Sequence, residues 1–271
     1  PGAVLYIKDR ASPTAITKDI TSSVFSGEDF LNEEGFLLYD VKNLAVSFDG
    51  NKLAFAMRAP EIEDADDEDQ PTWNIWEYNV ALQSVRRIIE SDVTAEAGQD
   101  ISPSYLPDDR ILFTSTRQST SKAILLDEGK PQFAAQDEDL GSDTFVLHAM
   151  NDDGSEIQQI TFNQSHDLDP IVLDNGKILF SRWDNAGQTR LNGINLYQVN
   201  PDGSGLTYQY GRHSHDSGTD NDIVQFSKPR ELENGNVMVQ LREFETANLS
   251  IVPTEVNIDD FIESDVSIGS T

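Results

Sequence analysis

Short runs of branched and aromatic residues alternate with polar turns along most of this chain. One unit occurs four times: a polar Asp-containing segment, a short apolar run, an Asp/Asn/Gly turn, and a β-rich run centred on a large apolar residue. Its copies are residues 44–58, 100–117, 167–182 and, more weakly, 225–242, with matched residues Phe55, Phe113, Phe180 and Val239. Such turns supply the positive φ angles that tight hairpins need, so each copy predicts a β-hairpin.

A second pattern follows each unit and predicts another hairpin. Its copies are residues 195–207, 146–157, 75–80 and 4–9, and the last has no first half before it. Four strands per repeat of about sixty residues predict an all-β fold, a β-propeller. We expect one domain over 1–271, with a half blade at 4–20, blades at about 38–91, 98–162, 165–212 and 222–254, and an acidic tail at 256–271. Four and a half blades favour part of a larger ring.

Charge narrows the choice of partners. The chain has 48 acidic and 19 basic residues and a formal net charge of −29. Nucleic-acid affinity depends largely on Lys and Arg, so this surface argues against a nucleic-acid partner. Anionic membrane surfaces are disfavoured for the same reason, and no apolar run reaches the length of a membrane helix. The acids keep the protein soluble or, alternatively, some of them bind a hard cation such as Ca²⁺.

Cysteine is absent, which excludes disulfides, thiolate nucleophiles and covalent c-type haem within this chain. The absence fits a periplasmic or extracellular location. The chain begins Pro1-Gly2-Ala3 without Met, so we expect a trimmed or partial polypeptide.

The repeat resembles that of TolB-like propellers. The segment 103–109 matches their first hairpin, with Asp109 in place of Gly, and 200–205 matches the second. A more particular resemblance, carried by 180–184, 196–203 and 210–216, is to bacterial proteins related to the hydrazine synthase alpha subunit. It implies a propeller that packs against redox domains or subunits outside this chain. The haem chemistry does not carry over, because C-x-x-C-H is absent.

Two loops hold candidate metal ligands. His166, Asp167 and Asp169 enter the third blade near the expected central channel, and carboxylates with an imidazole bind divalent cations. The alternative is local turn hydrogen bonds. A second loop enters the fourth blade and holds His213, His215 and Asp216. That loop is a metal or ligand site or a plain polar loop; a Ser–His–Asp triad lacks the G-x-S-x-G elbow.

Other features are interpreted structurally. The acidic segment 61–70 lacks the spacing of an EF-hand and is expected to be a solvated loop, with weak calcium binding as the alternative. An apolar insertion at 121–140 is a place for a partner to dock. The arginines near the second strand of each blade are expected to form inter-blade salt bridges: Arg58, Arg117, Arg182 and Arg242. Blade packing is expected for Trp73, Trp76, Trp183 and His148, the last as an aromatic plate.

The leading functional hypothesis is a non-catalytic, cell-envelope propeller that serves as a protein-interaction scaffold, within a larger redox protein. No catalytic motif is found, and protein partners or further domains of the same polypeptide are expected. The alternatives are a metal-dependent enzyme domain and the regulatory propeller of a prolyl oligopeptidase-like hydrolase. The intact protein's flanking sequence would discriminate between them.

Overall fold

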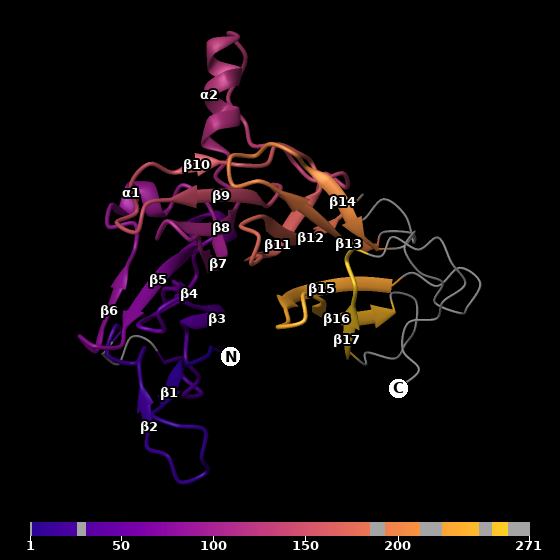
Figure 1. Ribbon diagram of the computed structural model, residues 1–271. Helices are drawn as coiled ribbons and strands as arrows, with labels where there is room; N and C mark the ends of the chain where they lie inside the picture. The colour runs from indigo at the N-terminus through magenta and orange to yellow at the C-terminus, as the bar shows by residue number, and fades with distance from the viewer. Residues whose placement is uncertain (1, 26–30, 185–192, 212–223, 244–250, 260–271) are drawn as a thin grey trace.

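The computed structural model describes residues 2–25, 31–184, 193–211, 224–243 and 251–259. Its strands form five antiparallel sheets that follow one another along an arc (Figure 1). Three of these sheets have four strands, one has three and one has two. The all-β propeller predicted from the repeat is therefore confirmed.

Each sheet consists of strands that are consecutive in the chain. The half blade is β1 (Tyr6–Lys8) and β2 (Thr17–Asp19). Blade 1 is β3 (Asp40–Val46), β4 (Lys52–Arg58), β5 (Trp73–Asn79) and β6 (Ser84–Arg87). Blade 2 is β7 (Asp100–Tyr105), β8 (Ile111–Ser115), β9 (Val146–Met150) and β10 (Gln158–Gln159).

The last two sheets continue the order. Blade 3 is β11 (His166–Val172), β12 (Ile178–Trp183), β13 (Ile194–Val199) and β14 (Thr207–Tyr210). Blade 4 is β15 (Val224–Glu231), β16 (Val237–Glu243) and β17 (Val252–Val256). The first strands of the four blades lie next to one another, so they form the inner wall of the arc.

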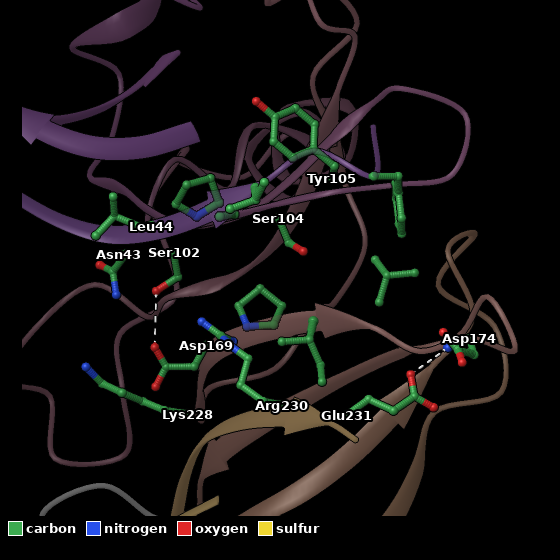
Figure 2. Close-up of a pocket in the computed structure, with 17 residues that line it drawn as sticks. Asn43, Leu44, Ser102, Ser104, Tyr105, Asp169, Asp174, Lys228, Arg230 and Glu231 are labelled. Atoms are coloured by element: carbon green, nitrogen blue, oxygen red, sulfur yellow. Dashed lines mark hydrogen bonds between the residues drawn. The ribbon is translucent and has the colours of Figure 1, made fainter. Parts of the chain in front are cut away.

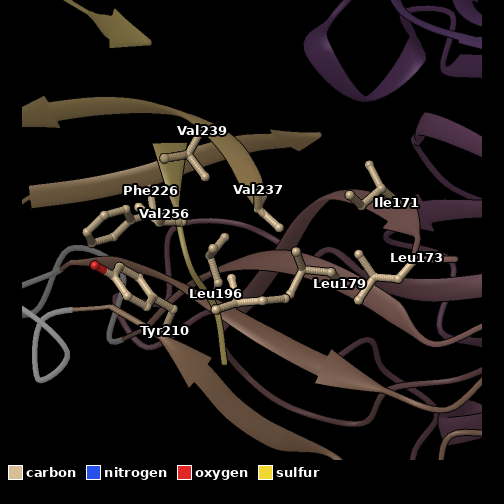
Figure 3. Close-up of a cluster of buried hydrophobic side chains, with 10 residues drawn as sticks. Ile171, Leu173, Leu179, Leu196, Tyr210, Phe226, Val237, Val239 and Val256 are labelled. Atoms are coloured by element: carbon tan, nitrogen blue, oxygen red, sulfur yellow. The ribbon is translucent and has the colours of Figure 1, made fainter. Parts of the chain in front are cut away.

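The hydrophobic core lies between the sheets, not within any one of them. Four buried clusters pack neighbouring sheets together: one lies between the half blade and blade 1, and the others lie between each blade and the next. Figure 3 shows the cluster between blades 3 and 4, where Phe226 and Val239 of blade 4 face Leu179 and Leu196 of blade 3. Val256 and Ile258 also belong to this cluster, so apolar packing continues to the start of the expected tail.

The matched residue of each repeat has the same place in every blade. Phe55, Phe113, Phe180 and Val239 are buried, and each packs against the sheet that precedes its own. Because the side chains of a strand alternate between faces, their neighbours pack against the following sheet. Ala54 and Ala56 do so on either side of Phe55. The repeat is thus a pattern of contacts between blades.

In three of the four blades, the third strand places an aromatic ring across from the matched residue. Trp76, His148 and Tyr197 lie directly across from Phe55, Phe113 and Phe180 in the strand pairing. The His148 ring lies 5.6 Å from the Phe113 ring, which confirms its predicted role in blade packing. His148 donates from Nδ1 to the Val146 carbonyl at 3.0 Å, and burial lowers its pKa to about 3.

The turns explain the Gly and Asp residues of the repeat. In blade 2, Asp109 takes the hairpin position that Gly50 and Gly176 occupy in blades 1 and 3, with a φ of 66°. The second hairpins place Gly154 and Gly203 against the preceding blade. A Cβ on Gly154 would lie 2.5 Å from the Ile88 carbonyl oxygen, and one on Gly203 would lie 2.7 Å from that of Ile160.

Helical segments are short additions to the sheets. They are η2 (Asp67–Asp69) in the acidic loop, α1 (Asp92–Ala95) between blades 1 and 2, and α2 (Ser119–Asp127) in the insertion. The acidic loop is exposed at η2, as expected for a solvated loop. Among the described residues, no helix is long and apolar enough to span a membrane.

The hairpin contacts between blades lead to a first prediction. Gly154→Ala and Gly176→Ala introduce the same Cβ at the same φ of 81°, but only the first meets a neighbouring carbonyl. We expect Gly176→Ala to lower the free energy of unfolding by about 1 kcal/mol through backbone strain. Gly154→Ala should cost at least about 2 kcal/mol more, because the blades must separate. Urea unfolding measures both values, and equal losses would contradict the contact.

Buried His148 leads to a second prediction, on pH. Its folded pKa of about 3 lies below the unfolded value, so the unfolded chain binds a proton first as the pH falls. The contribution of His148 to the free energy of unfolding has its full value above pH 6.5 and is lost as the pH falls from 6.5 to 3. Between pH 7 and pH 4, the free energy of unfolding of His148→Phe should therefore fall by about 3 kcal/mol less than that of the wild type. Identical pH dependence of the two unfolding free energies would refute this.

Candidate functional site

A central cavity of about 690 Å³ opens between the first strands of the four blades. Figure 2 shows its lining, which comes from β3, β7, β11 and β15. One side is apolar, with Leu44, Val46 and Phe48 of blade 1. Another side carries the charged residues Lys228 and Arg230 of blade 4. The cavity therefore combines an apolar surface with charged groups.

A β-bulge lies at the same place in each of these four strands. Between Leu168 and Ile171, for example, two residues of β11 face the single residue Phe180 of β12. The other bulges face Phe55, Phe113 and Val239. Each bulge therefore lies opposite the matched apolar residue of its own repeat.

The first residue of each bulge has a positive φ although none is glycine. The residues are Asn43 (54°), Ser102 (50°), Asp169 (48°) and Lys228 (51°), and all four line the cavity. Such a conformation costs about 1 kcal/mol or more per residue and is concentrated at functional sites in proteins. Four repeated instances around one cavity make it the candidate site of this protein.

Proline marks three of the four bulges in the sequence. Pro103, Pro170 and Pro229 each follow the residue with positive φ. Proline has no N–H for the strand ladder, so inside a sheet it is tolerated at bulges and edges. A polar residue followed by proline is therefore the signal in the sequence that could have located these three bulges.

Asp169 lies at the cavity, in agreement with its predicted position near the central channel. Its Oδ1 is 3.4 Å from the Ser102 hydroxyl, and the backbone N–H of Lys228 also donates to its carboxylate. Burial raises the pKa of Asp169, and the charge of Lys228 acts in the opposite direction. Asp169 therefore connects the bulges of blades 2, 3 and 4.

Asp167 does not line the cavity and forms a buried ion pair. Arg182 Nε lies 2.6 Å from Asp167 Oδ1, and its Nη2 lies 3.1 Å from Oδ2. Thr161 donates a further hydrogen bond of 2.6 Å to the same carboxylate. Each oxygen of Asp167 is thus already bound by the protein.

His166 belongs to a third environment, at the base of the insertion. Its Nδ1 accepts the Phe145 backbone N–H at 3.2 Å, so its Nε2 is the donor to Asp137 Oδ2 at 3.1 Å. The ring also lies between Phe145 and Trp183, at 5.9 Å from each. Both ring nitrogens of His166 are therefore in use.

The structure thus does not bring His166, Asp167 and Asp169 together around one point. Within the part of the chain that the structure describes, no group of three or more His, Asp or Glu is arranged to hold a metal ion. His213, His215 and Asp216 lie outside the described residues. A divalent cation at that second loop, calcium included, stays a prediction.

For Arg58, Arg117 and Arg182, the prediction of inter-blade salt bridges was wrong. Asp167–Arg182 and Asp100–Arg117 are both pairs within one blade, and they join the first strand to the end of the second. Arg58 pairs with Glu61 of the following loop at 2.6 Å. The reason is that Asp100 and Asp167 lie at the start of their inner strands, beside the end of the second strand of the same blade.

The insertion forms an arm that stands off the propeller. We call residues 118–143 the arm; it contains α2, which projects away from the sheets in Figure 1. No residue of α2 is buried. At the base of the arm, Gln118 is buried and donates to the Ala135 and Thr144 carbonyls at 3.1 and 2.9 Å.

Sequence comparison identifies no family for this chain. No family model matches it, and no curated protein matches it.

Solved structures are similar to it in fold. They include a puromycin hydrolase (10% identity, covering 99% of this chain and 35% of that chain, TM-score 0.56). Hydrazine synthase of Kuenenia stuttgartiensis has 15% identity, with 95% and 40% covered and a TM-score of 0.51. A putative TolB from Agrobacterium tumefaciens has 18% identity, with 62% and 48% covered and a TM-score of 0.42.

This chain spans less than half the length of each of these three chains. At these identities the likeness concerns the fold alone. The likeness to hydrazine synthase agrees with the more particular resemblance predicted from the sequence, and the chain folds as a β-propeller.

Proposed function

We infer that this chain is a non-catalytic protein-interaction scaffold and that the arm carries the contact. The observation behind this proposal is that α2, a helix of nine residues, buries none of them. Isolated helices shorter than about 12–15 residues are marginal in water, and most helices in proteins are stabilised by tertiary packing. A partner that covers α2 would supply that packing.

The composition of the arm supports this proposal. Four large apolar side chains of the arm are between 50 and 68% exposed: Ile124, Leu126, Phe133 and Leu140. Exposed apolar residues that occur singly need no explanation, whereas a group of them on one projecting element is typical of an interaction site.

The base of the arm is held firmly, which favours docking over random motion. Besides the Gln118 hydrogen bonds, Asp137 accepts a hydrogen bond from His166 of blade 3. Ser121 contacts Gln159 of β10 through two hydrogen bonds of 3.2 Å. A partner would therefore meet an ordered element and would lose less conformational entropy on binding.

The histidines of the described residues do not favour acid–base catalysis. His148 is buried within blade 2, and His166 is bonded through both nitrogens. Neither lines the central cavity. A general base must lie within hydrogen-bond reach of its substrate, and these two rings are enclosed by the protein.

We place this scaffold in the bacterial cell envelope, as part of a larger assembly. The net charge of −29 and the lack of cysteine are compatible with the periplasm. The resemblance to hydrazine synthase implies a partner that is a redox domain of the same polypeptide or a separate subunit. The fact that the chain spans less than half of the similar solved chains is compatible with either partner.

A site-specific cross-linking experiment tests the proposal. A photo-activated benzoyl-phenylalanine replaces Leu126 in the arm or, as the control, Leu82 in the β5–β6 turn, which is 74% exposed. The two proteins are produced in cells of the source organism and irradiated. We expect Leu126 to yield one discrete adduct with another protein or domain, identified by mass spectrometry, and Leu82 to yield none.

The variant Ile124→Ser/Leu126→Ser tests whether the apolar side chains of α2 make the contact. In this variant and in its parent, the cross-linker replaces Phe133. Both serines replace exposed side chains, so the unfolding temperature should not change, while the adduct should decrease at least fivefold. Absence of an adduct from the arm, or equal adducts from Leu126 and Leu82, would exclude the arm as the contact.

A further inference from the structure

We propose that the central cavity binds a carboxylate that carries an apolar group, with Lys228 and Arg230 holding the carboxylate. The proposal concerns a different surface from the arm and does not depend on the scaffold function.

The first observation concerns the exposure and the ion pairing of Lys228 and Arg230. Lys228 and Arg230 are both exposed at the cavity. Within the described part of the chain, no carboxylate oxygen lies within 4.0 Å of their side-chain nitrogens. Arg230 uses Nη1 to donate to the Pro229 carbonyl at 2.9 Å, and among the described residues its other guanidinium donors have no hydrogen-bond acceptor. In a chain with 48 acidic residues, two such cations in one cavity indicate an anion site.

Two of the three carboxylates that line the cavity, those of Asp169 and Glu231, are hydrogen-bonded within its wall. Asp169 accepts from the Lys228 backbone and from Ser102. Glu231 accepts the backbone N–H of Asp174 at 2.7 Å. In Figure 2, the side chain of Arg230 extends towards Asp169, and that of Lys228 runs past it. Asp169 and Glu231 therefore accept backbone N–H groups of the cavity wall, and among the described residues neither forms an ion pair with Lys228 or Arg230.

The bulges explain why these side chains face the cavity. A bulge re-aims the side chains beside it, and bulges are over-represented next to binding sites. Lys228 is the first residue of the bulge in β15, and Arg230 is the residue at which regular pairing resumes. The strain at Lys228 is thus the structural cause of its position.

The apolar side of the cavity selects the rest of the ligand. Leu44, Val46 and Phe48 line it and are 47, 61 and 71% exposed. Covering them with an apolar group would remove their surface from water. A cavity of about 690 Å³ is of the size that holds small ligands or the end of a peptide.

The net charge of −29 does not exclude such a ligand. Repulsion from charges farther away than about 8 Å is largely screened at physiological ionic strength. A bidentate contact between Arg230 and a carboxylate at short range is screened much less. Arg230 and Lys228 therefore decide whether an anion binds.

Calorimetric titration of the whole chain with 3-phenylpropionate tests the proposal. The neutral 3-phenylpropionamide and the cationic 3-phenylpropylamine serve as comparisons of the same shape. We expect the carboxylate to bind at least tenfold more tightly than either comparison. Lack of carboxylate binding, equal binding of the amide, or tighter binding of the amine would overturn the proposal.

Variants locate the site. Lys228→Met/Arg230→Met should weaken carboxylate binding at least tenfold, whereas Lys8→Met/Lys177→Met, with the same change in net charge outside the cavity, should not. Phe48→Ser should weaken it more than Phe162→Ser, which alters an apolar side chain that is 57% exposed and does not line the cavity. Equal effects of a variant and its control would place the ligand elsewhere.

A second titration distinguishes the two sources of this chemistry. Acetyl-Gly-Gly-Phe carries the same carboxylate and ring at the end of a peptide. Tighter binding of this peptide than of 3-phenylpropionate would support the proposal with a protein C terminus as the natural ligand. Weaker binding would support it with a free small carboxylate.

Discussion

One contact is repeated in every blade, and the fold depends on it. A large apolar side chain of the second strand faces a two-residue bulge of the first strand and packs against the preceding sheet. Each of the four apolar clusters of the described residues is shared by two consecutive sheets, so the core lies between the sheets. Stability is then a sum over neighbouring blades, as in other repeat proteins.

The buried ion pairs act at the inner end of the same hairpins. Asp100–Arg117 and Asp167–Arg182 join the two strands of the first hairpin where it begins. Burial raises the pKa of Asp100 to about 6, because desolvation outweighs the favourable charge of Arg117. Such a pair adds little net stability, but loss of one partner leaves a buried charge. These pairs therefore specify which hairpin ends meet.

Much of the fold could be predicted because the residues that repeat in the sequence are those that pack between the blades. Phe55, Phe113 and Phe180 are buried at equivalent positions, and the Asp/Asn-Gly turns fix the hairpins between strands. The helix α2 could not be predicted in this way, because it buries no residue and so shows no helical period. Its sequence indicated only an apolar insertion.

The candidate site was predicted in part. Asp169 lies at the central cavity, but His166 and Asp167 have separate partners. Successive residues of a strand point to opposite faces, which separates His166 from Asp167. Regular pleating would then have put Asp167 and Asp169 on one face. The bulge that begins at Asp169 breaks that relation, and only Pro170 marks it in the sequence.

Function in this protein is expected where the chain departs from its repeat. In a sequence selected for stability alone, local conformational preferences and packing would agree with the fold, with neither strained bulge residues nor an unpacked helix. Such exceptions are concentrated at functional sites. The bulges occur in all four blades, but the residues differ: Asn43, Ser102, Asp169 and Lys228. The backbone strain is thus common to the blades while the chemistry is not. A cavity of this kind can be specialised for one ligand by changing a single bulge residue, with the apolar clusters between the blades left intact.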